Sequence, residues 1–88
     1  MLPYKEKIIS ENKVVREFSA DADSSHLVWH RDREHRKIKV LFSEGWMLQK
    51  DNCLPEALVE GNIYEVKYGE WHRVIKGKGS LVIAIEKS

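Results

Sequence analysis

Short runs that alternate hydrophobic with polar residues recur along the chain, and each run ends at residues typical of turns. Alternation with a period of two is typical of β-strands with one buried face, because successive side chains point to opposite sides of a sheet. The last run, SLVIAIEK, is the most hydrophobic, so we expect it to be a central strand. The predicted strands are 13–19, 26–30, 36–42, 46–50, 62–67, 71–76 and 80–87. YKEKIIS (4–10) is compatible with a helix or a strand, and we favour the strand.

Many short strands at this spacing favour a closed barrel or a sandwich, because closure removes exposed strand edges. Residues 51–58 contain Asp, Asn and Pro, which predict an irregular segment between strands. The chain length of 88 residues is enough for one domain. We therefore predict a single all-β domain over residues 1–88, with an N-terminal strand and extension in 1–25 and the barrel in 26–87.

The charge balance and the apolar runs exclude several classes of partner. The sequence has 15 Lys and Arg against 14 Asp and Glu, so no overall field attracts nucleic acid or an anionic membrane. No apolar run approaches the roughly 18 residues that cross a bilayer, and the first residues lack the hydrophobic core of a signal peptide. The single cysteine, Cys53, provides neither a disulfide framework nor a zinc cluster. We expect a cytoplasmic protein without nucleic-acid or membrane partners.

Candidate chemistry is concentrated in the stretch WHRDREHRKIKVLFSEGW, residues 29–46. Residues two apart on a strand share a face, so His30 and Asp32 point the same way if a strand runs through both. His26, four residues before His30, is expected at the rim of the barrel. The arginines and lysines of the stretch alternate with acidic and apolar residues, which is typical of a solvated face.

Three tryptophans lie next to or between these residues. Trp29 and Trp71 directly precede His30 and His72, so on straight strands they face away from any site that the histidines form. We interpret the tryptophans as packing residues, against the N-terminal segment or against a partner subunit.

The sequence GNIYEVKYGEWHRVIK resembles the second conserved motif of the cupin superfamily, G-x5-P-x-G-x2-H-x3-N. Gly61, Gly69 and His72 stand at the two glycine positions and the histidine position. Lys67 replaces the proline of the motif, and Lys76 replaces its asparagine.

The first cupin motif, G-x5-H-x-H-x3-4-E-x6-G, matches more loosely. His30 takes the first histidine position, and Asp32 takes the second. Arg36 stands where the motif has a glutamate, and Ser24 and Ser43 replace its two glycines.

The resemblance extends over residues 26–87 and implies a small single-domain cupin-type β-barrel, also called a double-stranded β-helix or jelly roll. Cupins are commonly dimeric, and many hold one divalent metal. The resemblance therefore implies a homodimer, a divalent metal and a small-molecule ligand.

In a closed barrel His72 can face His30 and Asp32 across the interior. Two imidazoles and one carboxylate form a ligand set that suits Fe(II) and also accepts Mn, Zn or Ni. We predict that these three residues bind one divalent metal. Glu34 and His35 are substitute ligands if the register of the strand shifts, although alternation places His35 on the surface.

Arg36 leaves two alternatives open. A guanidinium about 5 Å from a dication is repelled by about 7 kcal/mol at an effective dielectric of 20. Arg36 either clamps a small anionic ligand beside the metal or pairs with Asp32 or Glu34. In the second case no metal binds, and the chain is a metal-free cupin that serves as a ligand-binding or dimeric interaction module.

The sequence carries no GxSxG, HExxH or P-loop motif and no Cys–His pair at a usable local spacing. No catalytic residue can therefore be assigned, and whether the chain is an enzyme stays open. A metal-dependent dioxygenase or isomerase is a third alternative, for which the sequence names no substrate.

Overall fold

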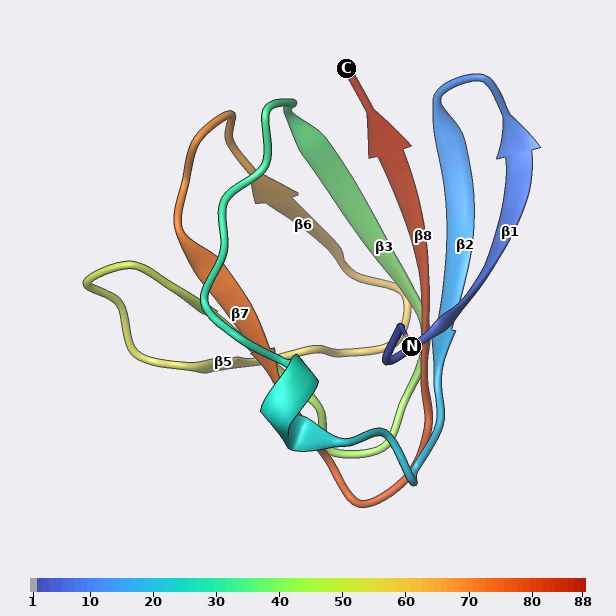
Figure 1. The fold of residues 1–88 in the computed structure, drawn as a ribbon, viewed down its shortest axis with the longest axis vertical. Coiled ribbons are helices and arrows are strands. Elements are labelled where there is room, and N and C mark those ends of the chain that lie inside the picture. Colours follow the sequence, from blue (N-terminus) through green and yellow to red (C-terminus); the bar gives the residue numbers. More distant parts are fainter. Residues whose placement is uncertain (1) are drawn as a thin grey trace.

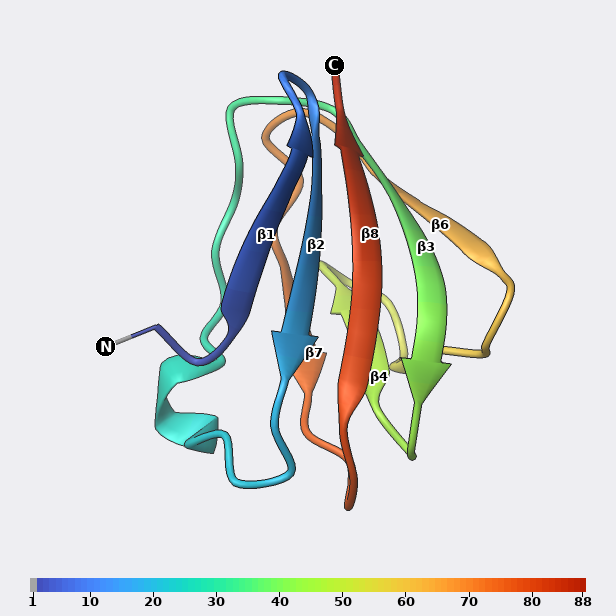
Figure 2. The ribbon, with the colours of Figure 1, turned by 90° about the vertical axis from the view of Figure 1, so that its right-hand side faces the viewer.

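The computed structural model describes residues 2–88, which form two antiparallel sheets facing each other (Figures 1 and 2). The larger sheet has the order β1-β2-β8-β3-β6, and the smaller sheet has the order β5-β4-β7. The strands are β1 (Lys5–Ser10), β2 (Lys13–Phe18), β3 (Arg36–Ser43), β4 (Met47–Lys50), β5 (Glu56–Ala57), β6 (Ile63–Val66), β7 (His72–Ile75) and β8 (Leu81–Lys87). The all-β prediction is confirmed.

Strand β8 is central in the larger sheet, as its hydrophobicity predicts. It pairs with β2 on one side and with β3 on the other. Its alternate residues Leu81, Ile83 and Ile85 are all buried and face the smaller sheet. A strand that is paired on both edges and buried on one face needs this density of apolar residues.

The core lies between the two sheets. Trp46 is fully buried there, packs against the ring of Phe18 with 5.3 Å between ring centroids, and donates from Nε1 to the carbonyl of Gly79 at 2.8 Å. The hydrogen bond removes the cost of burying the indole N–H. The buried cluster comprises Val14, Phe18, Ala22, Ile38, Val40, Trp46, Leu48, Leu58, Val66, Leu81, Ile83 and Ile85.

The predicted strand at 26–30 is wrong. Residues Ser24–His26 form a short 3-10 helix (η1), and the side chain of Asp23 accepts a hydrogen bond from the Ser25 amide at 2.9 Å. Asp and Ser side chains that bond to the nearby backbone favour a helical turn over a strand ladder. Alternation alone could not reveal this competition.

The segment after η1 runs along the open side of the two sheets to the start of β3 (Figures 1 and 2). It touches β7 through one isolated antiparallel bridge, between His30 and His72. The short strand β5 lies inside the segment 51–58 that the sequence predicts to be irregular. None of residues 2–88 belongs to a helix that is long and apolar enough to span a membrane.

Candidate metal centre

His30 and His72 are cross-strand neighbours, although 42 positions of sequence separate them. The His30 amide donates to the His72 carbonyl at 3.0 Å, and the His72 amide donates to the His30 carbonyl at 2.9 Å. A third backbone bond, from the Gly69 amide to the Asp32 carbonyl at 2.9 Å, continues the pairing. Residues 30–32 thus extend the edge of the smaller sheet beside β7.

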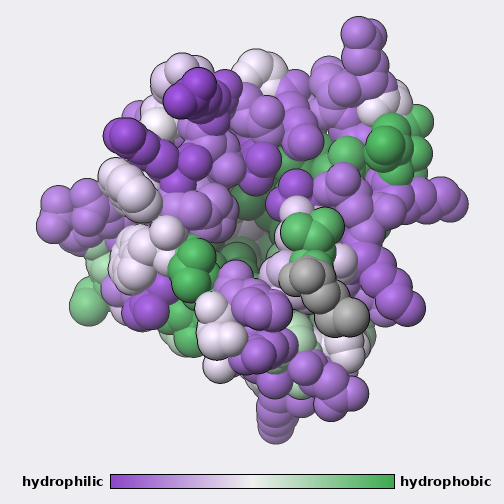
Figure 3. Space-filling model, in the orientation of Figure 1, coloured by the Kyte–Doolittle hydropathy of each residue, from purple (hydrophilic) through white to green (hydrophobic). Residues whose placement is uncertain are grey.

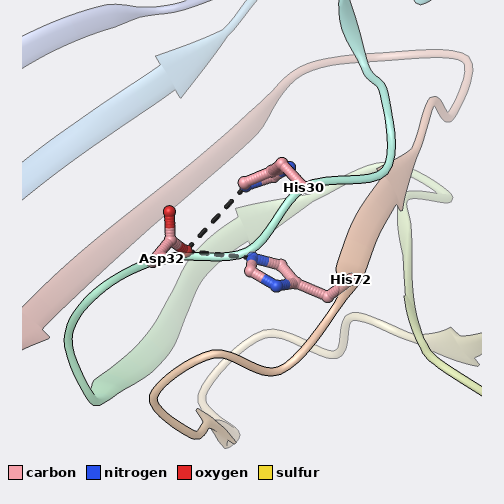
Figure 4. Close-up of side chains that lie close together, drawn as sticks. All are labelled: His30, Asp32 and His72. Carbon is pink, nitrogen blue, oxygen red and sulfur yellow. Dashed lines mark ion pairs between the residues drawn. The ribbon is translucent and has the colours of Figure 1, made fainter.

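The two histidines and Asp32 direct their side chains to one point (Figure 4). Asp32 Oδ2 lies 3.3 Å from His72 Nε2 and 3.9 Å from His30 Nε2. One ligand atom from each residue lies within 4.8 Å of the other two. The structure therefore brings together the three residues predicted as metal ligands. His30 and Asp32 do so without lying on a continuous strand, which differs from the sequence-based expectation.

Exposure rises across this cluster from the interior to the opening. The side chain of His72 is 5% exposed, that of Asp32 is 15% exposed, and that of His30 is 47% exposed. His72 is held as the first residue of a strand, whereas His30 lies in a segment without regular structure. The site consequently has a rigid inner ligand and a less restrained outer ligand.

Backbone carbonyls fix the tautomer of both rings. His72 Nδ1 lies 2.8 Å from the carbonyl of Glu70, and His30 Nδ1 lies 2.9 Å from the carbonyl of Val28. A carbonyl oxygen can only accept, so Nδ1 of each ring carries the hydrogen. Each neutral ring then presents the lone pair of Nε2 toward Asp32, which is the orientation of a metal-binding imidazole.

Burial lowers the pKa of His72 below its usual value, and the electrostatic effects of His30 and Arg36 act in the same direction. The Glu70 carbonyl and the Asp32 carboxylate act in the opposite direction, but burial is the largest cause. The ring is therefore neutral at pH 7. The neutral His72 ring and the Asp32 carboxylate therefore present two acceptor atoms 3.3 Å apart, which a cation between them would satisfy.

Arg36 borders this point from β3. Its Nη1 lies 3.1 Å from Asp32 Oδ2, and its Nε donates to Glu34 Oε2 at 2.7 Å. Among residues 2–88, no donor is aligned with the buried Asp32 Oδ2 well enough to form a hydrogen bond, so the guanidinium contact is an ion pair only. This ion pair is the one that the metal-free alternative predicts.

The other proposed ligands lie outside the cluster. Glu34 is engaged by Arg36 and also lies 3.9 Å from Lys87 Nζ. His35 Nε2 lies 3.6 Å from Glu65 Oε2, and both of these side chains are partly exposed. His26 is the last residue of η1 and lines the interior cavity, so its expected place on a strand is wrong.

A cavity of about 340 Å³ adjoins the cluster. Figure 3 shows a hollow near the middle of this face, with hydrophobic atoms in its depth. One end is polar and is formed by the three candidate ligands and Arg36, and the walls are mostly aliphatic. The apolar lining consists of Leu2, Pro3, Tyr4, Phe18, Leu27, Val28, Ile38, Leu48, Val74, Ile83 and Ile85.

Sequence reasoning missed one polar residue of the cavity, Arg16. It lies on β2, donates from Nε to Glu6 Oε1 at 2.7 Å and stacks over the Tyr4 ring at 4.3 Å from the centroid. Its place opposite Glu6 follows from the β1–β2 register, and the alternation of KVVREFS puts it on the same face as the buried Val14 and Phe18. The position of Arg16 could have been recognised from the sequence, because a charged residue stands there between two hydrophobic residues of the same strand face.

No protein-family model matches the sequence, and no curated protein matches it significantly. Solved structures match by fold. A cupin-domain structure from Bordetella pertussis aligns with 100% of this chain and 97% of its own, at a TM-score of 0.61 and 17% identity. An RmlC-like cupin with a double-stranded β-helix from Methanocaldococcus jannaschii aligns over 97% of this chain and 77% of its own, with a TM-score of 0.70 and 15% identity.

The chain has the cupin fold. The glycines of the second cupin motif now have a structural reason, because Gly61 and Gly69 adopt positive φ angles of 88° and 74°. Glycine is the residue that adopts this conformation without strain. The Gly69 amide also donates a hydrogen bond to the Asp32 carbonyl. This glycine of the second motif therefore helps to position the segment that resembles the first motif.

The DMSP lyase DddQ from Ruegeria pomeroyi also shares the cupin fold, with a TM-score of 0.79 and 12% identity over 97% of this chain. This chain spans 46% of the length of that lyase. Likeness at this level of identity concerns the fold and carries no activity from one protein to the other.

The donor set of this cupin fold fits a divalent transition metal. Two imidazoles and one carboxylate are available on converging side chains, and the buried Asp32 Oδ2 has no aligned hydrogen-bond donor among the described residues. Such a set is the 2-His-1-carboxylate arrangement that suits Fe(II) and other first-row ions.

Proposed function

We propose that the chain binds one divalent transition metal through His30, Asp32 and His72, and that it holds a small anionic ligand beside the metal in the interior cavity. The observation that carries this proposal is the direction of the two Nε2 lone pairs, both of which face a buried carboxylate oxygen without an aligned donor. A bound metal supplies a Lewis acid with open coordination positions. The metal could be Fe, Mn, Zn or Ni.

Arg36 determines the charge of the ligand in this proposal. Its guanidinium has five N–H donors in a planar fork, and the contacts with Asp32 and Glu34 engage only Nε and Nη1. The remaining donors suit a carboxylate. The aliphatic walls suit an apolar body, so the ligand class that fits best is a small carboxylate with a hydrocarbon portion.

His30 and His26 lie where such a ligand would enter. Both border the cavity, and the His30 side chain is the most exposed of the three candidate metal ligands. Leu2, Pro3 and Tyr4 border the same cavity. These residues would exclude water from the polar end once a ligand is seated.

One observation favours a second candidate function. The Arg36–Asp32 ion pair at 3.1 Å already neutralises the carboxylate, as expected for a metal-free module that binds an anion or a partner protein. In this alternative the guanidinium takes the place of the metal. The two candidates make opposite predictions for metal binding and the same prediction for anion binding.

Calorimetric titration of chelator-treated, untagged protein with Mn²⁺, Co²⁺, Ni²⁺ and Zn²⁺ tests the proposal. We expect one ion per chain in the wild type and no measurable binding in His30→Ala/His72→Ala. The matched control is His26→Ala/His35→Ala, which removes two histidines outside the cluster and should bind as the wild type does. Equal binding by the wild type and the His30→Ala/His72→Ala variant would reject the metal site and favour the second candidate.

The anion is tested on the same samples by titration with acetate, butyrate and hexanoate. We expect affinity to rise with chain length in the wild type, because the walls of the cavity are apolar, and to be lost in Arg36→Met. No preference between the three carboxylates would reject the proposed ligand class.

A further inference from the structure

The outer face of the His30–His72 pairing carries two stacked pairs of tryptophan and arginine. The Arg73 guanidinium lies over the Trp29 ring at 4.9 Å from the centroid, and the Arg31 guanidinium lies over the Trp71 ring at 5.2 Å. These four residues are the immediate neighbours of the two histidines in sequence. We call them the Trp–Arg clasp.

The register explains why the clasp forms there. His30 and His72 exchange both backbone hydrogen bonds, so the residues on either side occupy positions without such bonds, where cross-strand side chains approach most closely. Alternation turns His30 and His72 inward and the clasp residues outward. Trp29 with Arg73 and Arg31 with Trp71 therefore flank the bridge on its two sides.

The clasp is also anchored to the smaller sheet. Gln49 on β4 accepts two hydrogen bonds from Arg73, at 3.0 Å from Nε and 2.8 Å from Nη2. Arg73 thus connects β4, β7 and the segment that carries Trp29. By contrast, His30 lies outside the named strands, and its segment is paired by one isolated bridge and the Gly69–Asp32 backbone bond.

We propose that the Trp–Arg clasp positions His30 for the metal site. This inference rests on the proposed function, because the consequence of correct positioning is metal binding. Backbone bonds hold the segment at the His30–His72 bridge and at Asp32, but residues before His30 have no ladder with β7. Side-chain contacts on both sides of the bridge oppose rotation of the segment about its own axis and its separation from β7. The four clasp residues touch neither the cavity nor the candidate ligand atoms, so they act through His30.

The test uses Trp29→Leu, Trp71→Leu and the double variant, with Co²⁺ as the probe. Leucine removes the ring and leaves every charge in place. We expect each single variant to weaken Co²⁺ binding about two- to fivefold and the double variant to weaken it further, in proportion to the strength of exposed cation–π pairs. The visible absorption of bound Co²⁺ should change as His30 is lost from the coordination sphere.

Matched variants separate positioning from general stability. Trp29→Phe and Trp71→Phe keep an aromatic face and should restore most of the affinity. Arg31→Ala should weaken binding relative to Arg33→Ala, because both remove one exposed cation from the same segment but only Arg31 stacks on a ring. Wild-type affinity and spectrum in both Leu variants would overturn the proposal.

A readout without metal keeps the inference independent of the proposed function. The ring centroids of His30 and His72 lie 4.3 Å apart, so nuclear Overhauser contacts between their ring protons report the pairing directly in chelator-treated protein. We expect these contacts in the wild type and their weakening in the Leu variants. Wild-type protein that keeps the contacts but binds no Co²⁺ would reject the metal site alone, whereas unchanged contacts in Trp29→Leu and Trp71→Leu would reject the clasp.

Discussion

His72 Nε2 and Asp32 Oδ2 face each other at 3.3 Å, although neither atom carries a hydrogen when the ring is neutral and the carboxyl is ionised. The Glu70 carbonyl holds the ring hydrogen on Nδ1, and burial opposes a second proton on Nε2. Two acceptors at this distance repel unless a cation lies near both. In the metal-free protein Arg36 supplies part of that charge from one side.

Replacing Asp32 with Asn should separate folding from metal binding. The amide can donate to His72 Nε2, so the unfavourable contact becomes a hydrogen bond, while the anionic ligand is removed. We expect Asp32→Asn to unfold in the presence of a chelator at a temperature no lower than the wild type. Its Co²⁺ affinity should fall more than about tenfold, since even loss of an outer-shell partner costs that much.

Thermal unfolding and calorimetric titration measure the two effects on the same sample. Glu34→Gln is the control, because it neutralises a neighbouring acid that contacts Arg36 but lies outside the three-residue cluster. The proposed ligand role of Asp32 is wrong if Asp32→Asn and Glu34→Gln bind Co²⁺ equally well.

The lowered pKa of His72 predicts how the stability of the metal-free protein depends on pH. The unfolded chain takes up a proton at His72 as the pH falls through about 6.5, whereas the folded chain keeps the ring neutral to a lower pH. Between these two pKa values the unfolded state binds more protons, so stability decreases as the pH falls. It levels off below the folded pKa.

Urea unfolding at several pH values between 7.5 and 5, with a chelator present, measures this slope. His72→Gln should show a smaller loss of stability over this window, because the group that titrates differently in the two states is absent. His26→Gln, which removes an exposed histidine, is the matched variant for this comparison. Identical slopes in the wild type and His72→Gln would contradict the assignment.

Much of the fold could be predicted from alternation because most strands have one face in the core and one in solvent. The exceptions lie where local side chains or distant partners decide the structure. Asp23 turns the chain into η1, and residues 30–32 lie beside β7 without forming a ladder. Neither effect changes the alternation of hydrophobic and polar residues, so the sequence pattern does not reveal it.

The candidate site was predictable in its residues but not in its geometry. The H-x-D spacing places His30 and Asp32 on one face, and the motif glycines place His72. The tautomers depend on the carbonyls of Val28 and Glu70, which sequence patterns do not reveal. The ion pair of Arg36 with Asp32 was one of the alternatives that its replacement of a glutamate left open.

Removing Arg36 should strengthen metal binding. A dication at the cluster would be repelled by the guanidinium, and the ion pair competes with the metal for Asp32. We expect Arg36→Met to bind Co²⁺ at least several-fold more tightly than the wild type. The metal-free variant should be less stable by about 1–3 kcal/mol, because the partly buried Asp32 and Glu34 lose their charged partner.

Calorimetric titration and chemical unfolding of the variant measure the two quantities. Arg16→Met is the matched control, since it removes a second cavity-lining arginine that pairs with Glu6 and contacts none of the three candidate ligands. Weaker Co²⁺ binding by Arg36→Met than by Arg16→Met would show that Arg36 supports the metal site and does not compete with it.

The three tryptophans should respond differently to the same substitution. Trp46 is fully buried and bonded to the carbonyl of the buried Gly79, so Trp46→Phe leaves both a void and an unpaired acceptor. We expect a loss of about 2–4 kcal/mol in the free energy of unfolding. Trp71→Phe should cost less than about 1 kcal/mol, because that ring is 43% exposed and keeps an aromatic face toward Arg31. Chemical unfolding of both variants measures the difference, and equal losses would show that the exposed tryptophan contributes to the core.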